Sequence, residues 1–243
     1  MTIAIISDVH GNRPAFEAVL ADIAAVGCDR VWCLGDLVGY GAEPDRCVEL
    51  ARTHAELCLA GNHDLAVIGA LPVSEFSAWA LEAALWTQRT IAPDSVAFLR
   101  SLRSSAERDG IGLFHASPRD PVWEYVLSVT QAEACLDRQT ERIALIGHSH
   151  VALSFSRLDG AATVGVTHQP AETVDLAAGR WLLNPGSVGQ PRDGDPRAAW
   201  LELDLDRGAA VYQRIAYDID AAAAAILSAG LPDGLAERLR YGQ

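Results

Sequence analysis

Five short polar segments carry residue types that bind metal ions, and each directly follows a short apolar run. The segments are Asp8-Val9-His10, Gly35-Asp36, Gly61-Asn62-His63-Asp64, His115 and Gly147-His148-Ser149-His150. Their carboxylates, imidazoles and amide suit Mn, Fe, Zn, Ni or Co, and they exclude a soft thiolate site. A single Asp-x-His or His-x-His is usually structural, but these segments together use five of the seven histidines. The sequence therefore predicts a metal site.

The number and spacing of these residues fit two ions. Residues two apart in an extended segment, such as Asp8 and His10, project to the same side, so one segment can serve one ion or both. The ligands are too many for one tetrahedral ion, and the Asp36 carboxylate has two oxygens with which to bridge a pair. Two ions about 3.5–4 Å apart clamp a phosphoryl group and lower the pKa of water. The chemistry predicted from the residues is hydrolysis of a phosphoester.

The apolar runs before the polar segments are predicted to be buried strands. These strands are Thr2–Ser7, Val31–Leu34, Ala55–Ala60, Ile111–Phe114 and Ile143–Ile146. Pro14 and Pro44 begin helical patterns between the first three, which gives a βαβαβ unit with parallel strands. A capping box, Thr130-x-x-Glu133, predicts the start of a later helix. Because loops after the carboxyl ends of parallel strands converge on one crevice, we expect the polar segments to meet there.

The second half of the chain is predicted to contain antiparallel strands. Two hairpins with glycine-containing turns are expected, and their strands are Val151–Leu158 with Ala161–Val166 and Ala198–Leu205 with Ala209–Ile215. Antiparallel strands that follow parallel ones indicate an α/β protein with two mixed sheets packed together and helices outside. No linker or repeat divides the chain, so residues 1–243 are predicted to form one domain.

Residues 71–104 interrupt the strand series with a helical block. Apolar residues recur at helical spacing from Phe76 to Trp86, and a shorter helical pattern follows Asp94. The block lies between the third and fourth polar segments, so we expect it beside the mouth of the site. We predict that it forms a cap that restricts the size of the substrate.

Composition limits the classes of partner. The 243 residues include 19 Lys+Arg and 32 Asp+Glu, which gives a net charge of −13. This acidity argues against sequence-independent binding to nucleic acid or to an anionic membrane, since both need basic surface. No apolar run reaches the roughly 18 residues of a membrane span, and the start lacks the basic region of a secretory signal. Five cysteines without CxxC spacing predict reduced thiols in a cytoplasmic protein.

In order and spacing, the five polar segments resemble the motifs of the calcineurin-like metallophosphoesterases. The chain is most similar to their small bacterial and archaeal phosphodiesterase branch, from Ile3 to about Tyr212. The resemblance implies a four-layer α/β/β/α sandwich with a dinuclear metal site between the sheet ends. The ligands it implies are Asp8, His10, Asp36 and His150 for one ion, and Asp36, Asn62, His115 and His148 for the other.

The same resemblance implies catalytic roles for Asp36, Asn62 and His63. A metal-bridging hydroxide would be the nucleophile, and His63 would be the acid that stabilises the transition state or protonates the leaving group. The protein Ser/Thr phosphatases of this fold carry Arg and Glu where this chain has Leu37-Val38-Gly39-Tyr40 and Asp64. That difference argues against protein phosphatase activity and leaves phosphoester hydrolysis intact.

Several residues near the motifs are candidates for contact with a substrate. Asn12 and Arg13 directly follow the first motif and could reach a phosphate, although Arg13 could equally be a solvated first-turn residue. Tyr40 could stack on a base or cover the core. Ser187 resembles part of a loop near the site in relatives, and turn chemistry explains it equally well. Arg192 is a further candidate in the polar loop that follows.

The function predicted from these observations is metal-dependent phosphodiesterase or phosphatase activity on a small or nucleotide-like substrate, with manganese as the expected ion. The alternative is a catalytically weak binding or scaffold protein that has kept the fold. A complete ligand set argues against it. A nuclease of the same superfamily is a third interpretation, but the acidic surface and the lack of Lys/Arg clusters argue against it. Assembly into a homo-oligomer is expected from general frequency alone.

Overall fold

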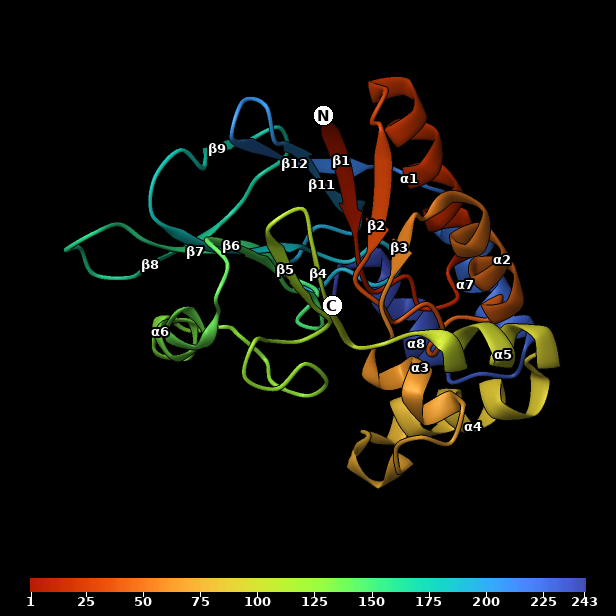
Figure 1. Cartoon of the computed structure of the whole chain (residues 1–243). Helices are drawn as coiled ribbons and strands as arrows, with labels where there is room; N and C mark the ends of the chain where they lie inside the picture. The colour runs from red at the N-terminus through yellow and green to blue at the C-terminus, as the bar shows by residue number, and fades with distance from the viewer.

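Two six-stranded mixed sheets lie face to face between helices in the computed structural model, which describes residues 1–243 (Figure 1). The first sheet has the order β3 (Leu57–Cys58), β2 (Arg30–Cys33), β1 (Thr2–Ile6), β11 (Ala198–Asp204), β12 (Ala209–Ile215) and β9 (Thr173–Asp175). The second has the order β4 (Ser105–Arg108), β5 (Ile111–Phe114), β6 (Ile143–Leu145), β10 (Arg180–Pro185), β7 (Ala152–Arg157) and β8 (Val164–Thr167). The predicted four-layer α/β/β/α sandwich is confirmed.

Parallel strands lie side by side in each sheet. In the first sheet β1 runs parallel to β2 and antiparallel to β11, so that Ile5 lies opposite Trp32 on one side and Leu201 on the other. In the second sheet β6 runs parallel to both β5 and β10, with Ala144 opposite Leu182. The carboxyl ends of these parallel strands give each sheet one edge from which several loops emerge.

Strand β1 is buried on both faces. Its side chains alternate, so that Ile3 and Ile5 pack in the core between the two sheets, whereas Ala4 and Ile6 pack in the core beneath the outer helices. All four are fully buried. Two buried faces account for the uninterrupted apolar sequence of this strand, which a strand exposed on one face would not show.

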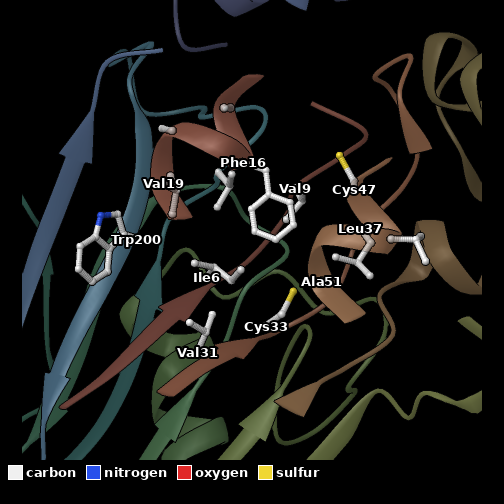
Figure 2. Packing of buried hydrophobic residues seen from close by; sticks show 14 of the residues in the cluster. Ile6, Val9, Phe16, Val19, Val31, Cys33, Leu37, Cys47, Ala51 and Trp200 are labelled. Atoms are coloured by element: carbon white, nitrogen blue, oxygen red, sulfur yellow. The ribbon is translucent and has the colours of Figure 1, made fainter. Parts of the chain in front are cut away.

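Helices α1 (Arg13–Val26) and α2 (Pro44–His54) cover the outer face of the first sheet. Figure 2 shows Phe16 and Val19 of α1 against Ile6 of β1, with Trp200 of β11 beside them. The Trp200 indole packs in this core and donates a hydrogen bond from Nε1 to Asp22 Oδ2 of α1 over 2.9 Å. Helix α6 (Val129–Arg138) lies on the opposite side of the molecule and covers the second sheet (Figure 1).

The predicted helical block is confirmed. It consists of a 3₁₀ turn, η1 (Val73–Glu75), and helices α4 (Ala78–Thr90) and α5 (Pro93–Ser101), which follow the short helix α3 (Asn62–Val67). Leu99 of α5 is fully buried in the core beneath α1 and α2, so the block is anchored in the main fold. The C-terminal elements α7 (Ile219–Ser228), α8 (Asp233–Glu237) and η2 (Arg238–Arg240) form an apolar cluster with α4.

Some sequence expectations need correction. Helix α6 begins after Ser128, whose Oγ accepts a hydrogen bond from Gln131 N, so the predicted start at the Thr130 capping box is wrong. Strands β4, β9 and β10 were not expected. The third predicted strand shrinks to Leu57–Cys58, because Ala55 already caps the end of α2 and Leu59 continues only as an isolated bridge to Arg103.

All five cysteines are free thiols, as expected. Burial raises the pKa of Cys28 to about 11 and that of Cys135 to about 11. Burial also raises the pKa of Cys47. These thiols therefore stay protonated at neutral pH and act as small apolar side chains. None of the helices has the length and apolar character that crossing a membrane requires.

Candidate metal centre

The polar segments meet where the carboxyl ends of the parallel strands in the two sheets come together. Each segment follows its strand as predicted: β1, β2 and β3 in the first sheet, and β5 and β6 in the second. The structure brings together three overlapping groups of side chains whose ligand atoms all lie within 4.8 Å of one another. These groups are Asp8 with His10 and His150, His10 with Asp36 and His63, and Asp36 with His115 and His148.

The first group is built around Asp8. His150 Nε2 lies 3.3 Å from Asp8 Oδ1, and His10 Nε2 lies 3.9 Å from the same oxygen. The Nε2 atoms of His10 and His150 are 3.1 Å apart. Two neutral imidazoles that turn their lone pairs toward one another repel, so this geometry suits a cation held between them.

A second cluster of ligand atoms surrounds Asp36, next to the group around Asp8. Asp36 Oδ2 lies 3.5 Å from His115 Nε2 and 3.7 Å from His10 Nε2. Asn62 places its Oδ1 3.2 Å from His115 Nε2. His148 completes this group. One carboxylate oxygen therefore lies between ligands of both groups, as a bridging ligand must.

The protein backbone fixes the tautomer of three of these histidines. The Nδ1 atoms hydrogen-bond to main-chain carbonyls over 3.1 Å for His10 and Val38, 3.0 Å for His115 and Leu34, and 2.6 Å for His150 and Gln190. A carbonyl only accepts, so each imidazole donates its Nδ1–H and presents Nε2 to the site. Burial lowers the pKa of all three rings and lowers that of His148 to about 3. Neutral imidazole is the form that binds metal.

Both carboxylates use one oxygen within the protein and leave the other free. Asp8 Oδ2 accepts from His148 N over 3.0 Å, and Asp36 Oδ1 accepts from His63 N over 2.9 Å. The buried atoms Asp8 Oδ1, Asp36 Oδ2 and His148 Nε2 have no hydrogen-bond partner. Buried polar groups without partners are strongly unfavourable. These residues fit a pair of divalent cations, since such ions would satisfy the three orphaned atoms together.

The two carboxylates also differ in charge environment. Burial acts to raise the pKa of Asp8, whereas His150, when that ring carries a proton, holds the pKa below the usual range. Burial, together with the charges of Asp64 and Asp8, raises the pKa of Asp36 well above it. Asp36 is therefore the group that most needs a nearby positive charge to stay ionised.

The backbone of the site adopts a conformation that side-chain-bearing residues rarely take. Six of the eight non-glycine residues with positive φ belong to it. They are Asp8, His10, Asp36, Tyr40, His148 and His150. Each such residue costs about 1–3 kcal/mol, and such strain persists where the surroundings hold it for a function. Here the positive φ values turn Asp8 and His10 of the first motif, and His148 and His150 of the last, toward the same cluster of ligand atoms.

Comparison with known proteins agrees with this geometry. The model of the calcineurin-like phosphoesterase superfamily domain matches residues 1–206 of the chain. The chain belongs to the calcineurin-like phosphoesterase superfamily. An uncharacterized protein of Methanocaldococcus jannaschii is 36% identical over an alignment of 246 positions, which covers 99% of this chain and 98% of that one.

Solved structures show the same fold. A metallophosphoesterase from Sphaerobacter thermophilus has a TM-score of 0.91 and 38% identity, and the match covers 100% of this chain and 99% of that chain. A hypothetical protein from Pyrococcus horikoshii shares the fold with a TM-score of 0.80 and 19% identity, over 100% and 98% of the two chains. The protein is a metal-dependent phosphoesterase.

A cavity of about 390 Å³ opens above the candidate metal ligands of the phosphoesterase. Asp36, Asn62, His63, His148 and His150 belong to its lining. The walls carry residues that the motifs did not reveal, namely Phe76, Trp123, Tyr125 and Arg238, together with the candidates Tyr40 and Arg192. Of these, only Trp123 and Tyr125 could have been predicted from the sequence, because their loop directly follows the strand that ends before His115.

Three of the predicted substrate contacts have structural roles instead. Asn12 caps α1 by accepting from Ala15 N and donates from Nδ2 to the Gly189 carbonyl. Arg13 pairs with Glu43 and Glu17. Ser187 Oγ donates to the Asp8 carbonyl over 2.7 Å and accepts from Gln190 N. None of these three residues lines the cavity above the metal ligands, whereas Tyr40 does.

Asp64 supports the site from behind the ligands of the phosphoesterase. Its Oδ1 accepts from Val38 N over 3.1 Å and its Oδ2 from Gly61 N over 3.0 Å, so it joins two ligand-bearing loops. Burial raises its pKa to about 7. The other two histidines are remote. His54 is exposed. His168 lies in the loop after β8, where its ring stacks on Tyr212 and its side chain is only 7% exposed.

Gly61 provides a test of the ligand geometry. A Cβ there would clash with the Asp36 carboxylate and lie 2.6 Å from His115 Cε1, although φ is −91°, which suits any residue. We predict that Gly61→Ala weakens manganese binding about 10–100-fold, as loss of ligand orientation does. The measurement is a competition titration against a chromophoric chelator.

Gly69→Ala is the matched control. A Cβ at Gly69 meets nothing within 4 Å, while its φ of +75° imposes strain on alanine. This variant should lose about 1–2 kcal/mol of stability and keep the manganese affinity of the wild type. Equal affinities in the two variants would contradict the proposed contact between Gly61 and the ligands.

Proposed function

We propose that the phosphoesterase hydrolyses a small, nucleotide-like phosphoester at a dinuclear centre bridged by Asp36. Asp8, His10 and His150 would hold one ion with Asp36, and the ligands of the other would be Asp36, Asn62, His115 and His148. The observation that carries the proposal is the buried, unpartnered Asp36 Oδ2 between ligands of both groups. A single ion would leave one of the two groups unused.

Manganese is the ion we propose, with Fe, Zn, Ni and Co as alternatives that the same ligands accept. Carboxylate and amide oxygens favour Mn, imidazoles suit Fe, Zn and Ni, and no thiolate is present. When bound, two such ions polarise the phosphoryl group and activate the water that attacks phosphorus. Asp36 and Asn62 contribute by placing their oxygen atoms as ligands at the floor of the cavity.

His63 would donate a hydrogen bond to the reacting group. Its ring lies among those of His10, Tyr40 and Phe76, with centroid distances of 4.8, 4.5 and 4.6 Å. It lines the cavity, and its Nδ1 is buried without a partner. Burial and the charge of Arg192 lower its pKa, so the imidazole is neutral in the free site. A neutral imidazole still has one N–H, which would stabilise a phosphoryl oxygen or the departing oxygen.

The cavity walls support a small substrate with a planar group. A volume of about 390 Å³ lies in the range of small-molecule sites, about 300–1,000 Å³. Phe76 packs at 5.7 Å from the Trp123 ring, and Tyr125 lies 4.1 Å from the His148 ring. Bases stack on such side chains. Phe76 and Ala80 come from the helical block, which supports its predicted role as a cap.

The role of His63 is tested by kinetics on manganese-loaded protein. We predict that His63→Ala lowers kcat about 10²–10⁴-fold on phosphoesters with an alkyl leaving group. The loss should be smaller with p-nitrophenol, because this leaving group departs without a proton. His54→Ala is the control, since His54 is exposed and outside the site. Chelator-treated protein gives the blank. Equal losses on both classes of leaving group would contradict donation to the leaving oxygen.

The predicted stacking of a substrate base on the cavity wall is tested by a substitution at Phe76. Deleting the whole block would also remove the buried Leu99 from the core, so a point variant is sharper. We predict that Phe76→Ala raises KM about tenfold for a p-nitrophenyl ester of a nucleoside 5′-phosphate, as loss of a stacked base does. KM for methyl p-nitrophenyl phosphate, which has no base, should change little. Ser74→Ala lies on the same 3₁₀ turn but not in the lining and is the control. Similar KM changes on both esters would contradict stacking.

A further inference from the structure

Two arginine side chains reach the substrate cavity without an Asp or Glu partner, and Arg238 donates from Nε to the main-chain oxygen of the C-terminal residue Gln243. Arg192 follows β10 and Arg238 begins η2, and both belong to the cavity lining. Arg192 donates to Gln190 Oε1 over 2.8 Å, while its Nε is buried with no partner. Nearby Arg214, by contrast, is paired with Asp193. Arg192 therefore reaches the cavity with hydrogen-bonding capacity that the protein does not fully use.

Both guanidinium groups lie near the ring of Tyr40. The Cζ atoms of Arg192 and Arg238 lie 5.5 and 5.9 Å from the centre of the Tyr40 ring, within the range of cation–π attraction. The same ring lies 4.7 Å from the His10 ring and 4.5 Å from the His63 ring. The two cations are therefore separated from the metal site by one aromatic side chain.

The pair of like charges is not neutralised within the cavity. Burial and the positive charge of Arg192 lower the pKa of Arg238. Apart from Asp36 at the floor, Glu75 is the carboxylate of the lining, and it is exposed. An anion placed against both arginines would remove their repulsion. The planar fork of a guanidinium matches phosphate oxygens, which favours a phosphate group as that anion.

We propose that Arg192 and Arg238 form a binding subsite for a second, non-scissile phosphate of the substrate. The inference rests on the proposed function, in which the metal ligands receive the scissile phosphate. Preferred substrates would therefore carry at least two phosphate groups. Arg238 lies outside residues 1–206, which the superfamily model matches. The C-terminal helices thus supply this part of the specificity.

The subsite is tested by calorimetric titration of the full-length, manganese-loaded protein with two probes. Methylphosphonate carries one anionic group and methylenediphosphonate carries two. The wild type should prefer the second probe, and Arg238→Gln and Arg192→Gln should each reduce that preference about tenfold, because charge-assisted hydrogen bonds are lost. Arg240→Gln is the control, since Arg240 lies on the same 3₁₀ turn and pairs with Asp220 at the surface. It should keep the wild-type preference.

Manganese content is measured on every sample, so that a loss of preference at full metal content is assigned to the arginines. If a glutamine variant does not fold, Arg238→Lys replaces it. Lysine keeps the charge but not the fork, so part of the preference should be lost. Unchanged preference in the arginine variants at full manganese content would overturn the subsite. Absence of turnover on every phosphoester, with the two-anion preference intact, would overturn the proposed function and not the subsite.

Two further ligands distinguish where the second phosphate is attached. A nucleoside 5′-diphosphate carries it next to the first phosphate, and a nucleoside 3′,5′-bisphosphate carries it across the sugar. Weaker binding of one of these to Arg238→Gln, with binding to Arg240→Gln unchanged, identifies the arrangement that the subsite accepts. Equal binding of both ligands by the two variants would count against the subsite as directly as the phosphonate titration.

Discussion

The structure depends on two buried carboxylates that the protein alone does not neutralise. Asp8 and Asp36 are fully buried, and each has one oxygen bound by a main-chain N–H and one oxygen without any donor. The surrounding imidazoles are neutral because burial lowers their pKa values. Leaving such charges uncompensated is very unfavourable. Bound cations would compensate these charges, and metal binding would then contribute to stability as well as to chemistry.

This constraint accounts for features that would otherwise be costly. Positive φ at several ligands strains the loops, and at Gly61 there is no room for a side chain beside Asp36. The strain is tolerated because six-stranded sheets fix the loop ends and Asp64 joins the Val38 and Gly61 loops. The ligand oxygens and nitrogens are thereby held in place before an ion arrives, which favours binding of transition-metal ions with defined geometry.

The clustering of the candidate metal ligands could be predicted from the sequence because their signal is local. A strand that is buried on both faces appears in the sequence as an apolar run. The residues directly after such a run, such as Asp8 and His148, lie where the parallel strands end. The cavity walls have no such signal. Arg238 is placed at the cavity because α8 and η2 pack on α4 through apolar side chains. No polar motif in the sequence marks this contact. For Asn12, an amide next to a motif fits a substrate contact and a helix cap equally well from sequence, and the structure shows the cap.

The net charge of −13 describes the outer surface of the protein and not the cavity. Most of the acidic residues lie outside the site, and several surface arginines are paired with them, as Arg30 is with Asp109. Positive charge for a phosphate substrate is concentrated at the cavity, from the ions that Asp8 and Asp36 would bind and from Arg192 and Arg238. Two divalent ions exceed the charge of their two carboxylates, so the loaded pocket is locally positive within an acidic envelope.

The central claim is that one carboxylate, Asp36, joins two ions. Electron paramagnetic resonance of protein loaded with two equivalents of Mn²⁺ per chain tests it most directly. A bridged pair gives the spectrum of exchange-coupled manganese, and Asp36→Asn, with one oxygen replaced by an amide nitrogen, should convert it to uncoupled ions or lose the second ion. A wild-type spectrum that accounts for all bound metal as isolated Mn²⁺ would contradict the account.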